Sequence, residues 1–460
     1  MAIQAPFPGV EPRMSSLPRR AASRLLTAAA GLAVALGASL TLVAPPASAD
    51  QVTPGDFTGY GFDQCLAPTQ QAMDRWLNYS PFLAVGIYIS GDSRGCRNQP
   101  NLTPAWVASQ LSKGWRLLPI TLGPQASCNP SFPRYRDDTT IIPRPGTDKS
   151  YAAARKQGRA EAASAVEAAQ ALGIDAGSTL WYDLEGFDVT QTRCRESALS
   201  FLSGWTWSLH QQGFVSGVYS SAGSGIKMLD DARVLRPDAF NLPDRIWIAR
   251  WDGVADTSTS YIRADGWLPG NRMKQFQGGH DEVWGGVRIN IDRDWLDLGK
   301  GSVAAPETHC GGVPVTFKTY PPLTTGTTAT SRVKALQCLL QERKAFTGNL
   351  NGTYGPRLVE AVHAWQTAHG MTVSDYWSRK NWMSLLADGT RPVAKFGSAG
   401  PQVRRIQRAL NASTLASLTV TGTYDAATVA AVRTWQARVD ASVTGVLSGR
   451  QWLTLQAGDR

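Results

Sequence analysis

Residues 179–186 read TLWYDLEG, and this stretch decides how the first half of the chain folds. Its apolar run predicts a short buried strand over Thr179–Leu184. Side chains alternate between the two faces of a strand, so Trp181, Asp183 and Glu185 share one face. Positions two apart on that face are separated by about 6.6 Å. The stretch therefore predicts a strand that presents two carboxylates, flanked by aromatic residues, at its carboxyl end.

Seven more short apolar segments alternate with helical stretches across residues 55–299. Ala-rich or amphipathic patterns predict helices over Tyr151–Leu172 and Arg195–Gln212. Eight strands alternating with helices are the pattern of a (β/α)₈ TIM-type barrel. A doubly wound open sheet is the alternative, but no G-x-G-x-x-G motif follows the first strand. The other predicted strands are Tyr60–Asp63, Leu83–Ile89, Arg116–Leu122, Val215–Ser220, Arg245–Trp251, Met273–Phe276 and Val287–Ile291.

Acidic residues stand at two further strand ends of the predicted barrel. The first strand ends in Asp63 and the last runs into Asp292, and these two strands adjoin when a barrel closes. Because barrel enzymes place their chemistry at the strand ends, Asp63, Asp183, Glu185 and Asp292 are the candidate catalytic residues. Paired carboxylates suit glycoside hydrolysis, in which one stays protonated as the acid and the other stays ionised. Alternatively, Asp63 caps the next helix and Asp292 pairs with Arg293 or Arg250.

The amino end carries the features of an export signal. Arg19 and Arg20 precede an apolar run over residues 25–43, and Ala47-Ser48-Ala49 form a small-residue cleavage pattern. The arginine pair resembles a twin-arginine signal. An uncleaved anchor is the alternative, because the run is about long enough to span a bilayer. We expect residues 1–49 to be removed, leaving no stable membrane anchor and a mature protein that is secreted or associated with the cell wall.

The carboxyl end contains a sequence repeat with a period of 70 residues and no gap. Such identity indicates a duplicated module. Apolar residues recur at helical spacing around a Gly-Thr-Tyr turn, so each copy reads as three helical pieces. We expect two small all-α modules, over residues 332–390 and 391–460. The matching positions include Val333 and Val403, Gln337 and Gln407, Gly352-Thr353-Tyr354 and Gly422-Thr423-Tyr424, Trp365-Gln366 and Trp435-Gln436, and Trp382 and Trp452.

A segment rich in Pro, Gly and Thr separates the predicted barrel, residues 50–300, from the repeats. This composition predicts a linker over residues 301–331 that acts as a tether. Residues 332–460 hold 16 Lys and Arg against seven Asp and Glu, a net charge of +9. That charge suits an anionic wall polymer. Nucleic acid would need the same sign, but no nucleic-acid motif is present and the chain is expected to be exported.

Six Cys and five His restrict the other chemistries. The His residues form no H-x-x-x-H or H-x-H arrangement, which argues against a zinc hydrolase, and we predict neither a metal nor a cofactor. An exported chain can keep disulfides. The first four cysteines, Cys65, Cys96, Cys128 and Cys194, allow three pairings, and Cys310 with Cys338 is predicted as a local pair. A cysteine nucleophile is the alternative, but it would want a nearby His.

The repeat order V-x-x-(I/L)-Q-x-x-L, G-T-Y, A-V-x-x-W-Q and W-x-x-L resembles the peptidoglycan-binding module of many wall hydrolases. The resemblance covers both copies almost completely. It implies a three-helix bundle that holds glycan or stem peptide in a shallow groove. The first copy has Ser374-Asp375-Tyr376 where that family usually has glycine near the turn, so we expect the two copies to bind unequally.

Four motifs of the predicted barrel resemble the family-25 lysozymes, which are barrel muramidases. They are Gly61-Phe62-Asp63, Tyr182-Asp183-Leu184-Glu185, Ile246-Trp247-Ile248-Ala249-Arg250-Trp251 and Asn290-Ile291-Asp292. The chain is still more similar to a glycoside-hydrolase-like domain of secreted actinobacterial-type proteins. This resemblance spans roughly residues 55–299. It implies the barrel more strongly than the activity, because that domain is named for its fold and not for a settled reaction.

The resemblance also implies roles for individual residues. Glu185 would be the proton donor, and Asp183 would stabilise charge at the anomeric carbon or position a substrate acetamido group. Asp63 and Asp292 would orient and electrostatically bias that pair. Five further residues would stack on sugars or hydrogen-bond to them: Tyr88, Gln125, Tyr182, Trp251 and Gln277. Of these, strand alternation points Tyr182 away from Asp183.

These features together predict an exported, lysozyme-like glycoside hydrolase that acts on peptidoglycan or a related wall glycan and is anchored by two wall-binding repeats. The alternative is a non-catalytic wall-binding protein whose barrel holds glycan without cleaving it. A cysteine peptidase or a metal-dependent amidase lacks its set of residues here.

Overall fold

The computed structural model describes residues 52–129, 137–414 and 416–460, so the predicted export signal lies outside the described residues. Eight strands close into a barrel in chain order, which confirms the predicted architecture. The strands are β1 (Phe57–Asp63), β2 (Ala84–Ser90), β3 (Arg116–Thr121), β4 (Thr179–Asp183), β5 (Val215–Ser221), β6 (Arg245–Ala249), β7 (Asn271–Trp284) and β8 (Val287–Leu298). Among the described residues, no helix is both long enough and apolar enough to cross a membrane.

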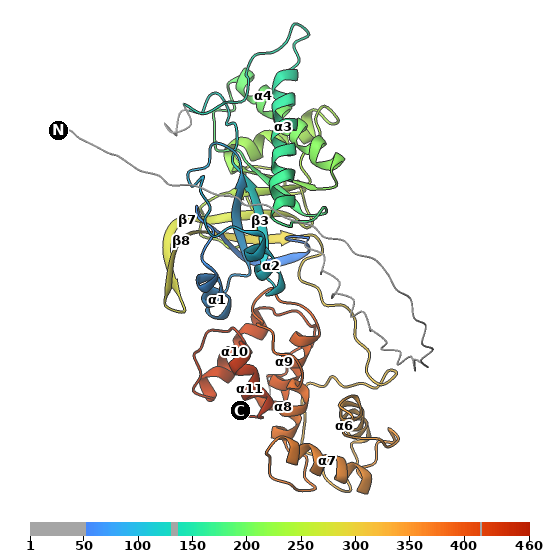
Figure 1. The fold of residues 1–460 in the computed structure, drawn as a ribbon. Coiled ribbons are helices and arrows are strands. Elements are labelled where there is room, and N and C mark those ends of the chain that lie inside the picture. Colours follow the sequence, from blue (N-terminus) through green and yellow to red (C-terminus); the bar gives the residue numbers. More distant parts are fainter. Residues whose placement is uncertain (1–51, 130–136, 415) are drawn as a thin grey trace, which may run out of the picture. The chain divides into compact units, whose positions relative to one another are not determined.

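Helices follow the first five strands of the barrel. They are α1 (Gln70–Tyr79), α2 (Pro104–Ser112), α3 (Ala152–Ala171), α4 (Thr192–Gln211) and α5 (Lys227–Leu235), the last preceded by a π-helical turn, η2 (Ala222–Ile226). α3 and α4 lie side by side (Figure 1). Two glycines permit this close approach, because a Cβ at Gly158 would clash with the Phe201 carbonyl and one at Gly204 with the Arg155 carbonyl. Glycine lowers helix propensity, so its cost here is offset by packing.

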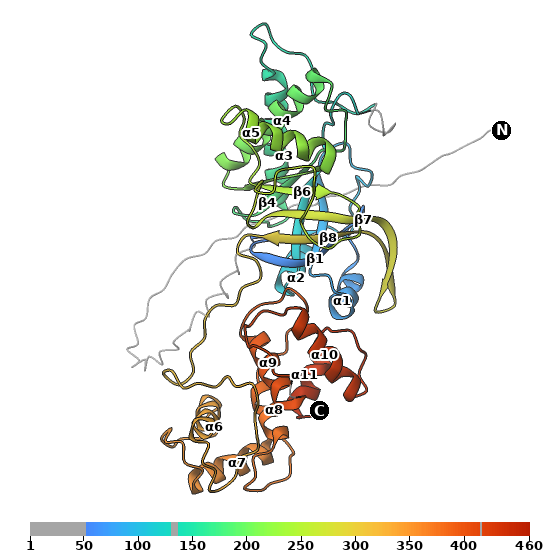
Figure 2. The same cartoon turned by 180° about the vertical axis from the view of Figure 1, so that it is seen from behind.

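The last strand of the barrel is reversed. Neighbouring strands from β1 to β7 pair in parallel, whereas β8 pairs antiparallel with both β7 and β1. A turn at Gly285 and Gly286, both at positive φ, joins β7 to β8, and the two strands form a long ribbon (Figure 2). The regular alternation expected from the sequence therefore stops after β6. Because β8 is reversed, its amino-terminal half reaches the end of the barrel where β1 finishes.

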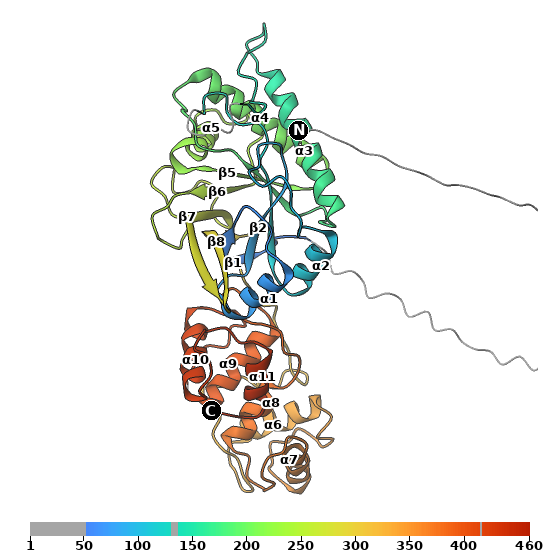
Figure 3. The ribbon, with the colours of Figure 1, turned by 60° about the vertical axis from the view of Figure 1, so that its left-hand side comes forward.

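The barrel interior is a packed core. Trp181 of β4 and Trp247 of β6 are buried and meet edge to face, with ring centroids 5.6 Å apart. Gly217 of β5 leaves room for the Trp181 ring, which a Cβ at this position would overlap. β1 lies between β2 and β8, so the ends of these three strands are neighbours (Figure 3).

The repeats fold as six helices, three from each copy. They are α6 (Thr330–Glu342), α7 (Pro356–Ala368), α8 (Arg379–Ala387), α9 (Pro401–Ser413), α10 (Ala426–Arg438) and α11 (Gly449–Gln456). The repeated Gln holds the Gly-Thr-Tyr turn in both copies. Gln337 accepts a hydrogen bond from Gly352 N–H and donates one to the Thr353 carbonyl. In the second copy, Gln407 accepts from Gly422 N–H and donates to the Thr423 carbonyl. These signature residues therefore maintain the module fold.

Part of the predicted linker packs into the core of the helical region. Val315, Tyr320 and Leu323 are buried there, and Trp382 of α8 donates to the Pro321 carbonyl. This differs from the free tether expected over residues 301–331. The segment is rich in Pro, Gly and Thr, but its few apolar side chains are enough to anchor it.

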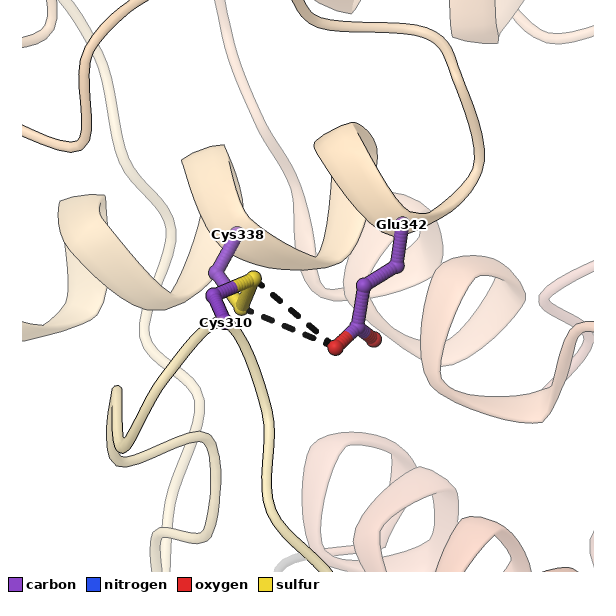
Figure 4. Close-up of side chains that lie close together, drawn as sticks. All are labelled: Cys310, Cys338 and Glu342. Atoms are coloured by element: carbon purple, nitrogen blue, oxygen red, sulfur yellow. Dashed lines mark hydrogen bonds between the residues drawn. A yellow bond between two sulfur atoms is a disulfide. The ribbon is translucent and has the colours of Figure 1, made fainter.

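The Cys310–Cys338 disulfide, predicted from the sequence, joins this segment to α6. Figure 4 shows both sulfur atoms close to the Glu342 carboxylate. These three side chains have the spacing of a metal site. However, each sulfur is already bonded to the other, so neither offers a thiolate ligand. The group is a structural crosslink.

Candidate active site

The four predicted catalytic carboxylates come together at one end of the barrel. Asp63 is the last residue of β1, and Asp292 lies directly opposite it on β8. Asp183 is the last residue of β4, and Glu185 follows two residues later. Asp63 and Asp183 are buried, at 4% and 3% exposure, whereas Glu185 and Asp292 are partly exposed. The exposed pair can therefore meet a substrate, and the buried pair lies behind it.

Asp63 does not cap the next helix, and Asp292 does not pair with Arg293 or Arg250, the alternatives that the sequence left open. Thr69, not Asp63, caps α1 by accepting from Ala72 N–H. Arg293 pairs with Glu282 at 2.5 Å, and Arg250 donates to the Tyr261 hydroxyl. Asp63 accepts instead a 3.0 Å hydrogen bond from Gln275 Nε2. Both aspartates thus face the barrel mouth.

Tyr219 of β5 lies among all four carboxylates. Its pKa is raised well above the usual range, first by burial and then by Glu185, Asp183, Asp63 and Asp292 together. Tyr88 of β2 also lies at the mouth, with its hydroxyl 3.4 Å from Asp183 Oδ2. Burial raises the pKa of Tyr88 as well, followed by the effect of Asp183. Both phenols therefore stay neutral and can donate hydrogen bonds at the mouth.

The carboxyl groups on β1 and β8 both have raised pKa values, Asp63 more strongly than Asp292. Burial, followed by the Asp292 charge, holds the pKa of Asp63 well above its usual range. Burial raises the pKa of Asp292 to about 6, although its hydrogen bond with Asp63 and the nearby His280 act in the opposite direction. His280 lies between acceptors, with Gly278 O at 3.0 Å and Glu282 Oε1 at 2.9 Å from its ring nitrogens. Acid and base forms thus coexist at the mouth.

Two small pieces of local structure position these side chains. Gly86 of β2 makes room for Asp63, because a Cβ at Gly86 would lie 2.5 Å from the Asp63 Cβ. Gln125, which follows β3, donates to the Asp183 carbonyl at 2.8 Å and accepts from Glu185 N–H at 2.9 Å. Gln125 was predicted to bind substrate. Its amide is instead occupied in bracing the backbone between the two catalytic candidates.

The other predicted sugar contacts divide into two groups. Trp251, just beyond β6, is 66% exposed and covers Gly278, where any side chain would overlap its ring. Its Nε1 donates to Gln275 Oε1 at 2.9 Å, which fixes the indole. Tyr182 was also predicted as a sugar contact, and this is wrong. Its side chain points outward, is fully buried against Phe201 and Trp205 of α4, and donates to the Pro124 carbonyl.

Gln275, and not the predicted Gln277, is the glutamine that enters the site. It donates to Asp63 and accepts from Tyr219 and Trp251. Gln277 is partly exposed and lies after an irregularity in the β7–β8 register. A bulge changes which residues face inward, and the sequence gives no sign of it here. The sequence analysis also missed Asp294, a buried carboxyl on β8. Regular alternation from Asp292 would have found it.

A pocket of about 290 Å³ opens beside this cluster. Asp63 and Asp292 lie on it, and the Cys65–Cys96 disulfide forms part of its wall. The other disulfide of the barrel joins Cys128 to Cys194, so the structure selects one of the three possible pairings. Within the described part of the chain, the mouth carboxylates do not converge closely enough to form a three-ligand metal site.

The fold and this site define an α/β barrel with a cluster of carboxyl groups at its mouth, followed by two helical modules. Residues 74–296 match the family model described as "Rv2525c-like, glycoside hydrolase-like domain". Residues 330–382 and 399–455 match "Putative peptidoglycan binding domain". The chain thus combines a glycoside-hydrolase-like domain with two peptidoglycan-binding domains, which confirms the resemblance to the glycoside-hydrolase-like domain and to the peptidoglycan-binding module.

The solved structures that match this chain share little sequence with it. An uncharacterised protein of B. stearothermophilus is 16% identical, with a TM-score of 0.31, over 52% of this chain and 95% of its own. The Mycobacterium tuberculosis Tat-secreted protein Rv2525c, in complex with L-tartrate, is 12% identical, with a TM-score of 0.35, over 53% and 98%. The modular autolysin LytC from Streptococcus pneumoniae is 11% identical, with a TM-score of 0.32, over 52% and 46%. No curated protein matches the chain.

Proposed function

We propose that this protein is an exported glycoside hydrolase that cuts peptidoglycan or a related wall glycan in its barrel. The observation that carries the proposal is the gathering of Asp63, Asp183, Glu185 and Asp292 around Tyr219. Hydrolysis of a glycosidic bond needs one carboxyl that gives a proton and another that stabilises or attacks the anomeric carbon. The two family matches support a wall glycan as the substrate.

Each carboxylate has a role that follows from its position. Glu185 lies beyond the end of β4 and is partly exposed, so it can reach a leaving-group oxygen and protonate it. Asp183 is buried beside the Tyr88 hydroxyl, where it stabilises positive charge at the anomeric carbon or orients a substrate acetamido group. Asp63 and Asp292 orient Asp183 and Glu185 and bias their charges electrostatically. The exposed face of Trp251 offers a stacking surface for a sugar ring.

The modules and the amino end give the enzyme its place of action. The net charge of +9 over residues 332–460 favours an anionic wall. Three disulfides suit an oxidising compartment outside the cytoplasm. We infer that residues 1–49 direct export, with Arg19 and Arg20 serving a twin-arginine route. The modules then keep the barrel close to insoluble substrate, which raises its effective concentration.

The test is hydrolysis of purified peptidoglycan by the mature chain and by two variants. Glu185→Gln keeps the size of the side chain but removes the transferable proton, and Asp183→Asn removes the charge. Each should lower the release of reducing ends by about 10²-fold or more. Asp297→Asn is the control and should keep the wild-type rate, because Asp297 pairs with Thr58 near the start of β1, at the opposite end of the barrel from the four carboxylates.

The outcomes separate a hydrolase from a binding protein. If folded wild type binds walls but releases no reducing ends from any wall, the barrel is a non-catalytic glycan-binding domain. If wild type and Glu185→Gln cleave equally fast, these four carboxylates are not the catalytic ones. Release of amino groups instead of reducing ends would indicate an amidase or peptidase.

A further inference from the structure

A carboxyl group outside the predicted motifs lies beneath the candidate site. Asp294 of β8 is fully buried opposite Gly61 of β1. Its Oδ1 accepts a 2.9 Å hydrogen bond from Trp247 Nε1. Its side chain lies beside that of Asp63, and Asp63 lies directly opposite Asp292. The three carboxyl groups therefore form a row that leads from the barrel core to the mouth.

The number of protons in this row follows from the burial of three adjacent carboxyl groups. Two neighbouring carboxyl groups can hydrogen-bond only if one of them is protonated, because an ionised carboxylate only accepts. One shared proton between each pair of neighbours removes the like-charge repulsion, so the row Asp294–Asp63–Asp292 would hold two protons and one negative charge. Burying two or three charges side by side would cost far more.

The position of the remaining charge follows from burial and from the neighbouring donors. Asp294 is fully buried and Asp63 is 4% exposed, whereas Asp292 is partly exposed and near His280. Trp247 donates to Asp294 Oδ1, so the Asp294 proton belongs on Oδ2. Gln275 donates to Asp63 Oδ2, and its amide is oriented by Tyr219 and Trp251. The negative charge therefore costs the least free energy when it lies on Asp292.

We propose that Asp294 is a protonated positioning residue that donates to Asp63, so that Asp63 donates to Asp292 and leaves Asp292 ionised at the mouth. This rests on the proposed function, because an ionised Asp292 is what biases the Asp183–Glu185 pair. Asp294 itself touches no substrate. It acts by fixing the direction of hydrogen-bond donation, from Asp294 to Asp63 and from Asp63 to Asp292.

Two variants of Asp294 test the proposal. Asp294→Asn is the mimic of a protonated aspartic acid, since its oxygen still accepts from Trp247 and its amide still donates to Asp63. Asp294→Leu has a similar volume but neither group. Asp297→Asn, on the same strand and outside the row, is the matched control.

The first readout is infrared absorption of the full chain, which needs no activity. Wild type at pH 7 should show the carbonyl band of a protonated carboxyl that Asp294→Asn loses and Asp297→Asn keeps. The second readout is thermal stability against pH. Burial raises the folded-state pKa of Asp294, so above about pH 4 this group holds more proton in the folded state than in the unfolded state. The contribution of Asp294 to the stability of wild type therefore falls as the pH rises, and Asp294→Asn escapes this loss. Its advantage in melting temperature should grow by about 2 °C or more between pH 4.5 and pH 8.

Activity supplies the third readout. If wild type cleaves glycan, Asp294→Asn should keep its rate and the shape of its pH profile, while Asp294→Leu should lose about 10-fold or more through misplacement of Asp63. An unchanged infrared band in Asp294→Asn, or a stability advantage that does not grow with pH, overturns the proposal. These two results do not depend on turnover. They therefore separate failure of the proton assignment from failure of the proposed hydrolase activity.

Discussion

Trp251 shows how one residue combines an exposed apolar surface with a fixed orientation. It is 66% exposed, yet Gly278 packs under its ring and Gln275 accepts from its indole N–H. A ring held in this way loses little conformational entropy when a sugar stacks on it. The residue was predicted from the sequence by resemblance, and the structure supplies the support that makes a stacking role physically reasonable.

We expect Trp251→Ala to weaken binding of soluble wall oligosaccharides by about 10-fold, the usual scale for removing a central tryptophan contact. Isothermal titration with the full chain measures the change. Trp207→Ala on α4 is the matched control, because that ring is 40% exposed and stacks under Arg159. Equal affinities for wild type and Trp251→Ala would remove Trp251 from the binding site.

Strand β2 works in the site through an absent side chain. Gly86 lies against Asp63, and it is the lack of a Cβ that lets the Asp63 carboxyl enter the mouth. β8 works through its register, since its antiparallel pairing with β1 sets Asp292 directly opposite Asp63. In both cases the element, and not the named acid, decides whether the carboxylates meet.

Gly86→Ala should therefore displace Asp63 and destabilise the barrel by about 1–3 kcal/mol, the cost of overpacking a close-packed interior. Chemical denaturation followed by far-UV circular dichroism measures this cost. Gly449→Ala at the start of α11 makes the same chemical change with only a 4.0 Å contact and should be neutral or slightly stabilising. A Gly86→Ala barrel as stable as wild type would show that the close approach of β2 to Asp63 is readily relieved.

At the scale of the whole molecule, the described residues form two hydrophobic cores, and the boundary of the second does not follow the sequence repeat. The repeat begins near Val333, but the core that contains it also includes Val315, Tyr320 and Leu323. Cys310 is crosslinked to Cys338 as well. The segment before the repeat therefore belongs physically to the helical region.

This assignment predicts different behaviour for two fragments. Residues 301–460 should fold and sediment with purified peptidoglycan, less strongly at high salt because part of the attraction is electrostatic. Residues 332–460 lack three buried side chains and one disulfide, and should melt at least several degrees lower. Differential scanning calorimetry compares the two. Equal melting temperatures would mean that the segment before the repeat adds nothing to the module.

The sequence by itself determined the features that depend on local patterns. Alternation in TLWYDLEG placed Asp183 and Glu185 at one strand end, and the ungapped repeat alone was enough to reveal two modules. The eight strands were each found near their observed positions, because short apolar segments bounded by turns are a local signal. The Cys310–Cys338 bond was found for the same reason, since both cysteines lie close together along the chain and apart from the other four.

Only the tertiary structure decided the features that depend on contacts between distant residues. The reversal of β8, the bulge that exchanges Gln277 for Gln275, and the outward position of Tyr182 follow from strand pairing and helix packing. The row Asp294–Asp63–Asp292 depends on the register of β1 against β8, across more than 200 residues of chain. A register is set by the global balance of burial and pairing, and no local pattern encodes it. The carboxylates could be named from the sequence, but which of them holds a proton is decided by the fold.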